Sequence, residues 1–135
     1  GYMIVQYAAA SMVSENKIYA HPASVDSIPS SANQEDIVSM GTTAGRKAGM
    51  IVKNTLDCLA LELMTSCQAI DIRRRLNSHG QGITPLHQAI YNKVREKVAF
   101  FEIDREIWPD IQAVKEMIYS GELLELIKEY IPDFQ

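Results

Sequence analysis

The chain of 135 residues is 47% apolar and 22% charged, a composition typical of a folded protein in water. Its net charge of −4 disfavours nucleic-acid binding, which depends on a basic surface. No apolar stretch reaches the roughly 18 residues that span a membrane, and the opening residues lack the basic start of a secretory signal. We therefore expect no nucleic acid and no membrane among its partners.

The two cysteines, Cys58 and Cys67, lie on one predicted helix. A rise of about 13 Å separates them, which is too far for a disulfide bond. Reduced thiols favour a cytoplasmic location. Their position on an apolar helix favours inert core residues over nucleophiles.

Residues 1–16 have the pattern of the end of a helix, and residues 17–32 that of a loop. The apolar residues at helical spacing in the first segment are Met3, Tyr7, Ala10 and Val13. Pro22 and Pro29 exclude a continuing helix from the second segment, whose serines are typical of turns.

A long helix is expected over residues 33–76, about 40 residues without a proline. Ser31 or Asn33 is suited to cap its start, and Glu35 and Asp36 suit its first turn, where the helix dipole favours acids. Such a helix is about 60 Å long, whereas a compact globule of this size is about 35–40 Å across. Since its apolar residues also lie on several faces, we expect it to pack on other parts of the protein or on other subunits.

Three glycines, Gly41, Gly45 and Gly49, share one face of this helix. Each costs roughly 0.5–1 kcal/mol of helix stability relative to alanine. Either they form a smooth groove that lets another helix approach closely, or they are tolerated in a helix that tertiary packing holds.

The basic residues 73–75 and the glycines beyond them are typical of a helix end. Three shorter helices are expected over residues 84–101, 109–119 and 121–130, the first of them capped by Thr84. No strand pattern is found in the sequence. The sequence therefore predicts an all-α fold, a fragment of a long-helix bundle with short C-terminal helices.

The three histidines, His21, His79 and His87, lie on separate segments and lack the spacing of zinc motifs. The regularly spaced glycines lie inside a predicted helix and lack the Lys-Ser/Thr ending of a phosphate-binding loop. We therefore expect no metal site and no nucleotide-phosphate loop.

Three runs of residues are distinctive: QYAAASMVSENK at 6–17, HPASVDSIPSSANQEDIVSMG at 21–41 and QAIDIRRR at 68–75. With them the chain closely resembles the carboxyl-terminal part of the histidine ammonia-lyases and of the wider family of aromatic amino acid lyases and mutases. Members of this family are several times longer. The resemblance implies that this sequence is a carboxyl-terminal portion of a larger chain.

The resemblance assigns roles to residues of the NQED run. It implies that Glu35 is catalytic and lies near the substrate, and that Asn33 and Gln34 bind the substrate close to an electrophilic cofactor. Met3 matches a methionine that lines the pocket around the substrate's ring. From the residues alone, Gln34, Glu35 and Asp36 are helix-start residues and Met3 is a core filler.

The cofactor that the resemblance implies is 4-methylidene-imidazol-5-one (MIO), which forms from an Ala-Ser-Gly tripeptide. This tripeptide is absent, because Ala10–Ser11 is followed by Met12 and Ala23–Ser24 by Val25. We therefore expect the prosthetic group on upstream sequence, and we expect this chain alone to be inactive. The long helix is expected at the centre of a homotetramer.

The implied reaction is the non-oxidative elimination of ammonia from L-histidine, which gives trans-urocanate. Glu35 would serve either as a base or as an anchor for the substrate. Ile37 departs from the pattern, since a histidine commonly follows NQED in histidine ammonia-lyases. An aromatic amino acid aminomutase or a tyrosine ammonia-lyase on the same scaffold is one alternative, and a non-catalytic helical assembly module is another. Met3 disfavours the phenylalanine-specific branch, which tends to a lysine there.

Overall fold

The computed structural model describes residues 2–76 and 82–134, and these residues form five α-helices and one short 3-10 helix. In chain order they are α1 (Met3–Tyr19), η1 (Ala23–Asp26), α2 (Gly41–Leu76), α3 (Pro85–Lys97), α4 (Trp108–Tyr119) and α5 (Glu122–Tyr130). Within the described residues the only β-type pairing is an isolated bridge between Ser30 and Glu35. The predicted all-α fold is confirmed.

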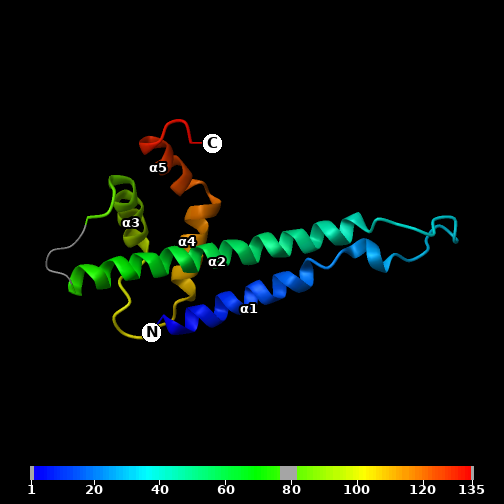
Figure 1. Ribbon diagram of the computed structural model, residues 1–135, viewed down its shortest axis with the longest axis horizontal. Helices are drawn as coiled ribbons and strands as arrows, with labels where there is room; N and C mark the ends of the chain where they lie inside the picture. The colour runs from blue at the N-terminus through cyan, green and yellow to red at the C-terminus, as the bar shows by residue number, and fades with distance from the viewer. Residues whose placement is uncertain (1, 77–81, 135) are drawn as a thin grey trace.

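Figure 1 shows α2 as the long axis of the molecule. Helix α1 runs antiparallel to the N-terminal and middle parts of α2, and the loop that joins them extends beyond both helices at one end. Helices α3, α4 and α5 gather around the C-terminal half of α2, with α4 crossing it (Figure 1). The molecule is therefore a rod at one end and a small helical cluster at the other.

The long helix α2 has 36 residues and begins at Gly41, so the predicted start near residue 33 is wrong. The reason lies in the backbone of the preceding residues. Four residues without the freedom of glycine have left-handed φ angles that an α-helix excludes. They are Ser31 (50°), Ala32 (56°), Asn33 (68°) and Met40 (53°). Consequently Glu35 and Asp36 are loop residues rather than first-turn acids. At 36 residues α2 is still about 54 Å long, so the argument for further packing partners holds.

The other helix bounds also differ from the sequence pattern. Helix α1 continues to Tyr19, three residues beyond the predicted end at 16, and the loop occupies residues 20–40 rather than 17–32. Helix α3 ends at Lys97, short of residue 101, while Thr84 caps its start by accepting a hydrogen bond from the His87 N–H. The last helix begins only after Gly121, whose φ of 82° is a turn conformation. His79 and its neighbours at 77–81 lie outside the described residues.

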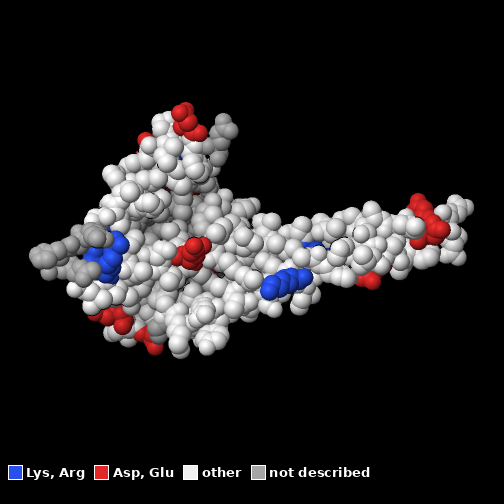
Figure 2. Space-filling model, viewed as in Figure 1, with Lys and Arg blue, Asp and Glu red and all other residues white. Residues whose placement is uncertain are grey.

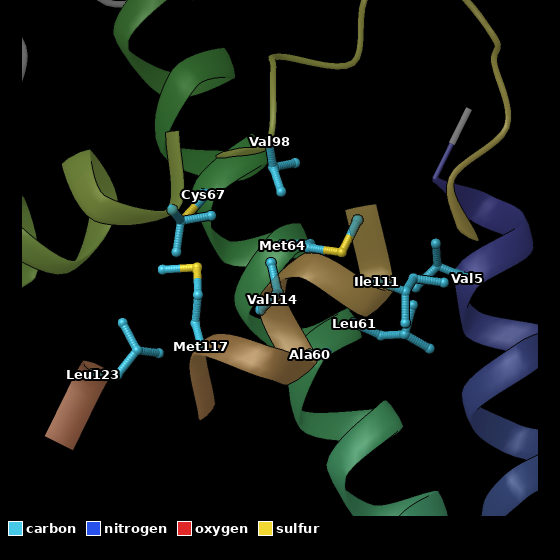
Figure 3. Close-up of a cluster of buried hydrophobic side chains, with 11 residues drawn as sticks. Val5, Ala60, Leu61, Met64, Cys67, Val98, Ile111, Val114, Met117 and Leu123 are labelled. Atoms are coloured by element: carbon cyan, nitrogen blue, oxygen red, sulfur yellow. The ribbon is translucent and has the colours of Figure 1, made fainter. Parts of the chain in front are cut away.

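The hydrophobic core lies where α4 crosses the C-terminal half of α2, and α1, α3 and α5 each add a residue or two (Figure 3). Its buried members are Val5, Ala60, Leu61, Met64, Cys67, Val94, Val98, Ile111, Val114, Met117 and Leu123. Burying side chains of this size stabilises the fold by roughly 1.5–3 kcal/mol each. The core therefore stabilises the helical cluster, and most of the rod lies outside the core.

Polar side chains on α2 reinforce this cluster. The Gln68 amide donates to the Phe101 carbonyl at 2.9 Å and accepts from the Phe101 N–H at 3.0 Å, which satisfies the backbone of the segment between α3 and α4. Lys115 of α4 donates to Asp57 at 2.7 Å, and both side chains are largely buried. Helix α2 thus carries hydrogen-bonding partners for its neighbours in its middle and in its C-terminal half.

The rod, by contrast, exposes much apolar surface. Helix α1 is described throughout, and of its residues only Val5 is buried. Its large exposed apolar residues are Met3, Ile4, Tyr7, Val13 and Ile18. From Gly41 to Met50, every residue of α2 except Lys47 is exposed. Figure 2 shows that charged side chains are sparse along the face of the rod in view. Exposed apolar surface on this scale is typical of a face that packs against another chain or segment.

None of the helices in the described ranges 2–76 and 82–134 is long and apolar enough to cross a membrane.

Candidate functional site

The loop at residues 20–40 holds three of the four residues that the sequence predicts at a site: Asn33, Gln34 and Glu35. The loop lies at the far end of the rod, away from the helical cluster (Figure 1). Acidic side chains are visible at its tip (Figure 2). All three predicted residues are exposed in the single chain. The structure therefore brings them together on one open turn.

The turn closes between Ser30 and Glu35. The Ser30 N–H donates to the Glu35 carbonyl at 2.8 Å, and the Glu35 N–H donates to the Ser30 carbonyl at 3.3 Å. Inside the turn, the Gln34 N–H donates to the Ser31 carbonyl at 3.2 Å. The Ser30 hydroxyl also donates to Glu35 Oε2 at 3.0 Å. Ser30 therefore holds both the backbone and the side chain of Glu35 through hydrogen bonds.

Three of the four residues inside this turn carry backbone strain. Ser31, Ala32 and Asn33 are consecutive residues in the left-handed region. Asparagine tolerates this region, whereas serine and alanine gain little from it, and each such residue costs of the order of 1–3 kcal/mol. Strain of this kind persists only where the surroundings impose it, and it is concentrated at functional sites.

Further contacts tie the loop to itself and to α2. The Ser27 hydroxyl accepts a hydrogen bond from the Val38 N–H at 2.7 Å. The Lys47 ammonium donates to the His21 carbonyl, and the His21 Nε2 lies 3.3 Å from an Asp26 carboxylate oxygen. His21 therefore makes local hydrogen bonds, and the loop is braced although it lies outside the hydrophobic core.

The Glu35 carboxylate is available for chemistry at the tip of this braced loop. Ser30 holds one of its oxygens, and within the described part of the chain no other side chain hydrogen-bonds to it. Asn33 and Gln34 precede Glu35 in the same turn and carry amide groups, which both donate and accept hydrogen bonds. The arrangement can bind a polar, positively charged group or take up a proton.

Met3, the fourth predicted residue, lies elsewhere. It begins α1, whose 17 residues span about 25 Å, and the loop lies beyond the other end of that helix (Figure 1). Its side chain is 76% exposed, so the interpretation of Met3 as a core filler is wrong for the single chain. One copy of this chain does not bring Met3 to Glu35.

Ser30 is the residue that the sequence analysis missed. In the sequence it is one of several serines in a polar loop, and a Ser-x-x-x-x-Glu spacing has no general structural meaning. The strained turn between the two residues is what makes them neighbours. The contact depends on left-handed φ angles at residues 31–33, and the types of these residues do not predict such angles.

Within residues 2–76 and 82–134, other chemistry-bearing residues do not form a second site. In the described residues, no three His, Cys, Asp or Glu side chains lie close enough together to hold a metal ion. Burial raises the pKa of both the Cys58 and the Cys67 thiol, which opposes the reactive thiolate form. Grooves run along α2, between it and α1 or α4, and the 30–35 turn does not line them. We place the candidate site at the turn because the turn carries the exposed carboxylate and amide groups that the sequence predicts at a site.

Comparison with known proteins identifies relatives of this chain. The family model described as aromatic amino acid lyase matches residues 1–96. The histidine ammonia-lyase of Caldanaerobacter subterraneus subsp. tengcongensis is 54% identical over 129 residues, which are 96% of this chain and 24% of that protein. The histidine ammonia-lyase of Symbiobacterium thermophilum is 50% identical over 128 residues, or 95% of this chain and 24% of that protein.

Solved structures give the same result. Histidine ammonia-lyase from Trypanosoma cruzi superposes with a TM-score of 0.87 at 41% identity, over 98% of this chain and 25% of that one. Tyrosine aminomutase from Streptomyces globisporus superposes with a TM-score of 0.84 at 34% identity, over 96% of this chain and 24% of that one. The chain thus spans about a quarter of the length of the relatives that it matches. On this evidence the chain belongs to the aromatic amino acid lyase family.

Proposed function

We propose that this chain works as the carboxyl-terminal quarter of a histidine ammonia-lyase, which converts L-histidine to trans-urocanate and ammonia. The observation that carries the proposal is the identity of 50% and 54% to histidine ammonia-lyases over nearly the whole chain. The exposed carboxylate of Glu35, held on a strained and braced turn, supports it from the chemistry of the site.

In this proposal Glu35 acts directly on the substrate. A carboxylate can accept a charge-assisted hydrogen bond from the substrate's ammonium group or imidazole ring, or it can take the β-proton whose loss accompanies the departure of ammonia. Asn33 and Gln34, the two residues before it, carry amide groups that can orient the substrate's polar atoms. Both roles of Glu35 need a fixed carboxylate in a site from which other parts of the enzyme exclude water.

The MIO group of this family does not fit the residues of this chain. The nearest sequences to its parent tripeptide are Ala10–Ser11–Met12, inside α1, and Ala23–Ser24–Val25, inside η1. Neither can form the group, because both lack the glycine. We therefore propose that an electrophile, where the enzyme uses one, is supplied by sequence outside these 135 residues, and that this chain alone is inactive.

The proposed enzyme is a cytoplasmic homotetramer in which α2 packs against equivalent helices. The exposed apolar residues of α1 and the nearly fully exposed stretch from Gly41 to Met50 support such an assembly. It also offers a way to unite the predicted site. Because α1 separates Met3 from Glu35 in one chain, we propose that Met3 of one protomer completes the pocket around Glu35 of another.

An aromatic amino acid aminomutase is the second candidate. The superposition on a tyrosine aminomutase is nearly as close as that on the histidine enzyme, with TM-scores of 0.84 and 0.87. Ile37 also departs from the pattern of the histidine ammonia-lyases, in which a histidine commonly follows NQED. The higher identity to the histidine enzymes, 41% against 34% among the two structures, favours the lyase.

The test is an assay of the polypeptide as its source organism makes it, after its mass has been measured. L-Histidine, L-tyrosine and L-phenylalanine are supplied in turn, and urocanate, cinnamate-type products, ammonia and β-amino acids are quantified. The proposal predicts a polypeptide about four times heavier than this chain that forms urocanate from L-histidine. A β-amino acid product would establish the mutase instead, and a native polypeptide of 15.1 kDa without activity would leave only a helical assembly module.

A further inference from the structure

We propose that Ser30 is a positioning residue for Glu35: its hydroxyl holds the carboxylate in the orientation in which it meets the substrate. The inference rests on the proposed function, in which Glu35 acts on the substrate. It goes beyond that function by assigning the orientation of the carboxylate to one neighbouring side chain.

The contacts between the two residues are of two kinds. Two backbone hydrogen bonds, of 2.8 and 3.3 Å, hold Ser30 and Glu35 opposite each other as an antiparallel pair. They fix the Cα of Glu35 but leave its side chain free to rotate. The Ser30 hydroxyl then donates to Glu35 Oε2 at 3.0 Å, which selects one side-chain orientation. The other carboxylate oxygen stays available to a substrate.

The turn itself explains why Ser30 can do this. Ser31, Ala32 and Asn33 all have left-handed φ angles, so the chain reverses within four residues and returns Glu35 to the side of Ser30. Pro29, directly before Ser30, has its φ fixed by its ring, so the chain enters the turn with one fewer free torsion angle. A short, strained turn that serves only to connect two helices would have no need of this geometry.

Exposure makes the hydroxyl dispensable for folding. Ser30 and Glu35 are both exposed, and a hydrogen bond between exposed side chains contributes little to stability because water replaces it. A reason for this contact is therefore to be sought in turnover rather than in stability. In the assembled enzyme, where the site is closed to water, an unoriented carboxylate loses the advantage of a prearranged group.

The experiment uses the full-length enzyme with Ser30→Ala, Ser30→Thr, Glu35→Ala and the double variant Ser30→Ala/Glu35→Ala. We expect Ser30→Ala to lower kcat/KM about tenfold with an unchanged melting temperature and oligomeric mass. Ser30→Thr keeps a hydroxyl and should restore most of the activity. In the Glu35→Ala background, Ser30→Ala should cost nothing further, because Ser30 then has no carboxylate to position.

Ser27→Ala is the matched control, since the Ser27 hydroxyl braces the same loop through the Val38 N–H without touching Glu35. Ser27→Ala should lower the melting temperature and leave kcat/KM close to the wild-type value. Wild-type activity in Ser30→Ala, or equal fold-losses from Ser30→Ala with and without Glu35, would overturn the inference alone. An unaffected Glu35→Ala would overturn the proposed role of Glu35 together with it.

Discussion

Asp71 of α2 and Arg95 of α3 form a largely buried ion pair, with 2.6 Å between the Asp71 Oδ2 and the Arg95 Nη2. The Arg95 Nε donates to the same oxygen at 3.0 Å, and the Tyr91 hydroxyl donates to the other one. Arg95 also donates to the Val98 carbonyl at 3.1 Å. This network holds α3 against the C-terminal end of α2 and includes the carbonyl of Val98, a core residue.

We predict that Asp71→Asn lowers the free energy of unfolding by about 2 kcal/mol, because it leaves the Arg95 charge partly buried without its partner. The measurement is the urea midpoint of the intact protein. Glu102→Gln is the control: its ion pair with Arg75, at 3.4 Å, is exposed on both sides and should contribute less than about 0.5 kcal/mol. Equal midpoints for the two variants would show that the network contributes no more than a surface pair.

A size series at Gly45 tests the role of the glycine face of α2. In the described single chain, a Cβ at Gly45 would meet nothing within 4 Å. If that face stays open, Gly45→Ala stabilises the protein by roughly 0.5–1 kcal/mol through its higher helix propensity. We predict the opposite in the full-length enzyme, with Gly45→Ala weakening and Gly45→Leu disrupting assembly. The oligomeric mass and melting temperature check it, and a stabilised, intact oligomer in both variants would mean that the face is no interface.

Glu122 of α5 gives a pH dependence. Its two carboxylate oxygens lie 3.0 Å from the Lys93 and 2.8 Å from the Lys97 ammonium of α3. Hydrogen bonds from Lys97 and then from Lys93 lower the pKa of Glu122 below its ordinary value. Its contribution to stability is therefore complete above the unfolded-state pKa and is lost as the pH falls through the lowered folded-state pKa.

We predict accordingly that the melting temperature falls further in the wild type than in Glu122→Gln between about pH 6 and about pH 3. The glutamine variant lacks the ionisation and should show only the acid dependence of the remaining groups. Parallel curves for the two proteins would show that the pair contributes nothing measurable.

The sequence could predict the helical fold because its signals are local. Thr84 caps α3, as its residue type indicates. Pro22 and Pro29 keep α-helix out of the loop, which holds only the short 3-10 helix η1. The start of α2 could not be predicted in this way. Ser31 and Asn33 suit a helix cap as well as they suit a turn, and only the left-handed backbone of residues 31–33 decides between the two.

The candidate site was predictable only by resemblance. Periodicity gave Glu35 and Asp36 the same first-turn role, and the structure places both in the loop instead. The structure separates Glu35 from Asp36 by their contacts, since the Ser30 hydroxyl donates to the carboxylate of Glu35 within the closed turn. The exposure of Met3 in one chain could not be predicted from the neighbouring residues either. We propose that other parts of the enzyme cover this surface, and they lie outside the local sequence.

The most direct test of a catalytic carboxylate at the loop tip is the rate of urocanate formation by the full-length enzyme carrying Glu35→Gln. Glutamine keeps the shape of the side chain and its bond to Ser30 but removes the charge. We predict a fall in kcat/KM of at least about tenfold, or about 1.4 kcal/mol of transition-state stabilisation, with the melting temperature and oligomeric mass unchanged. Asp36→Asn, the neighbouring exposed carboxylate, should stay within about twofold of the wild type. Unchanged turnover in Glu35→Gln, or equal losses in both variants, would contradict a catalytic role for Glu35.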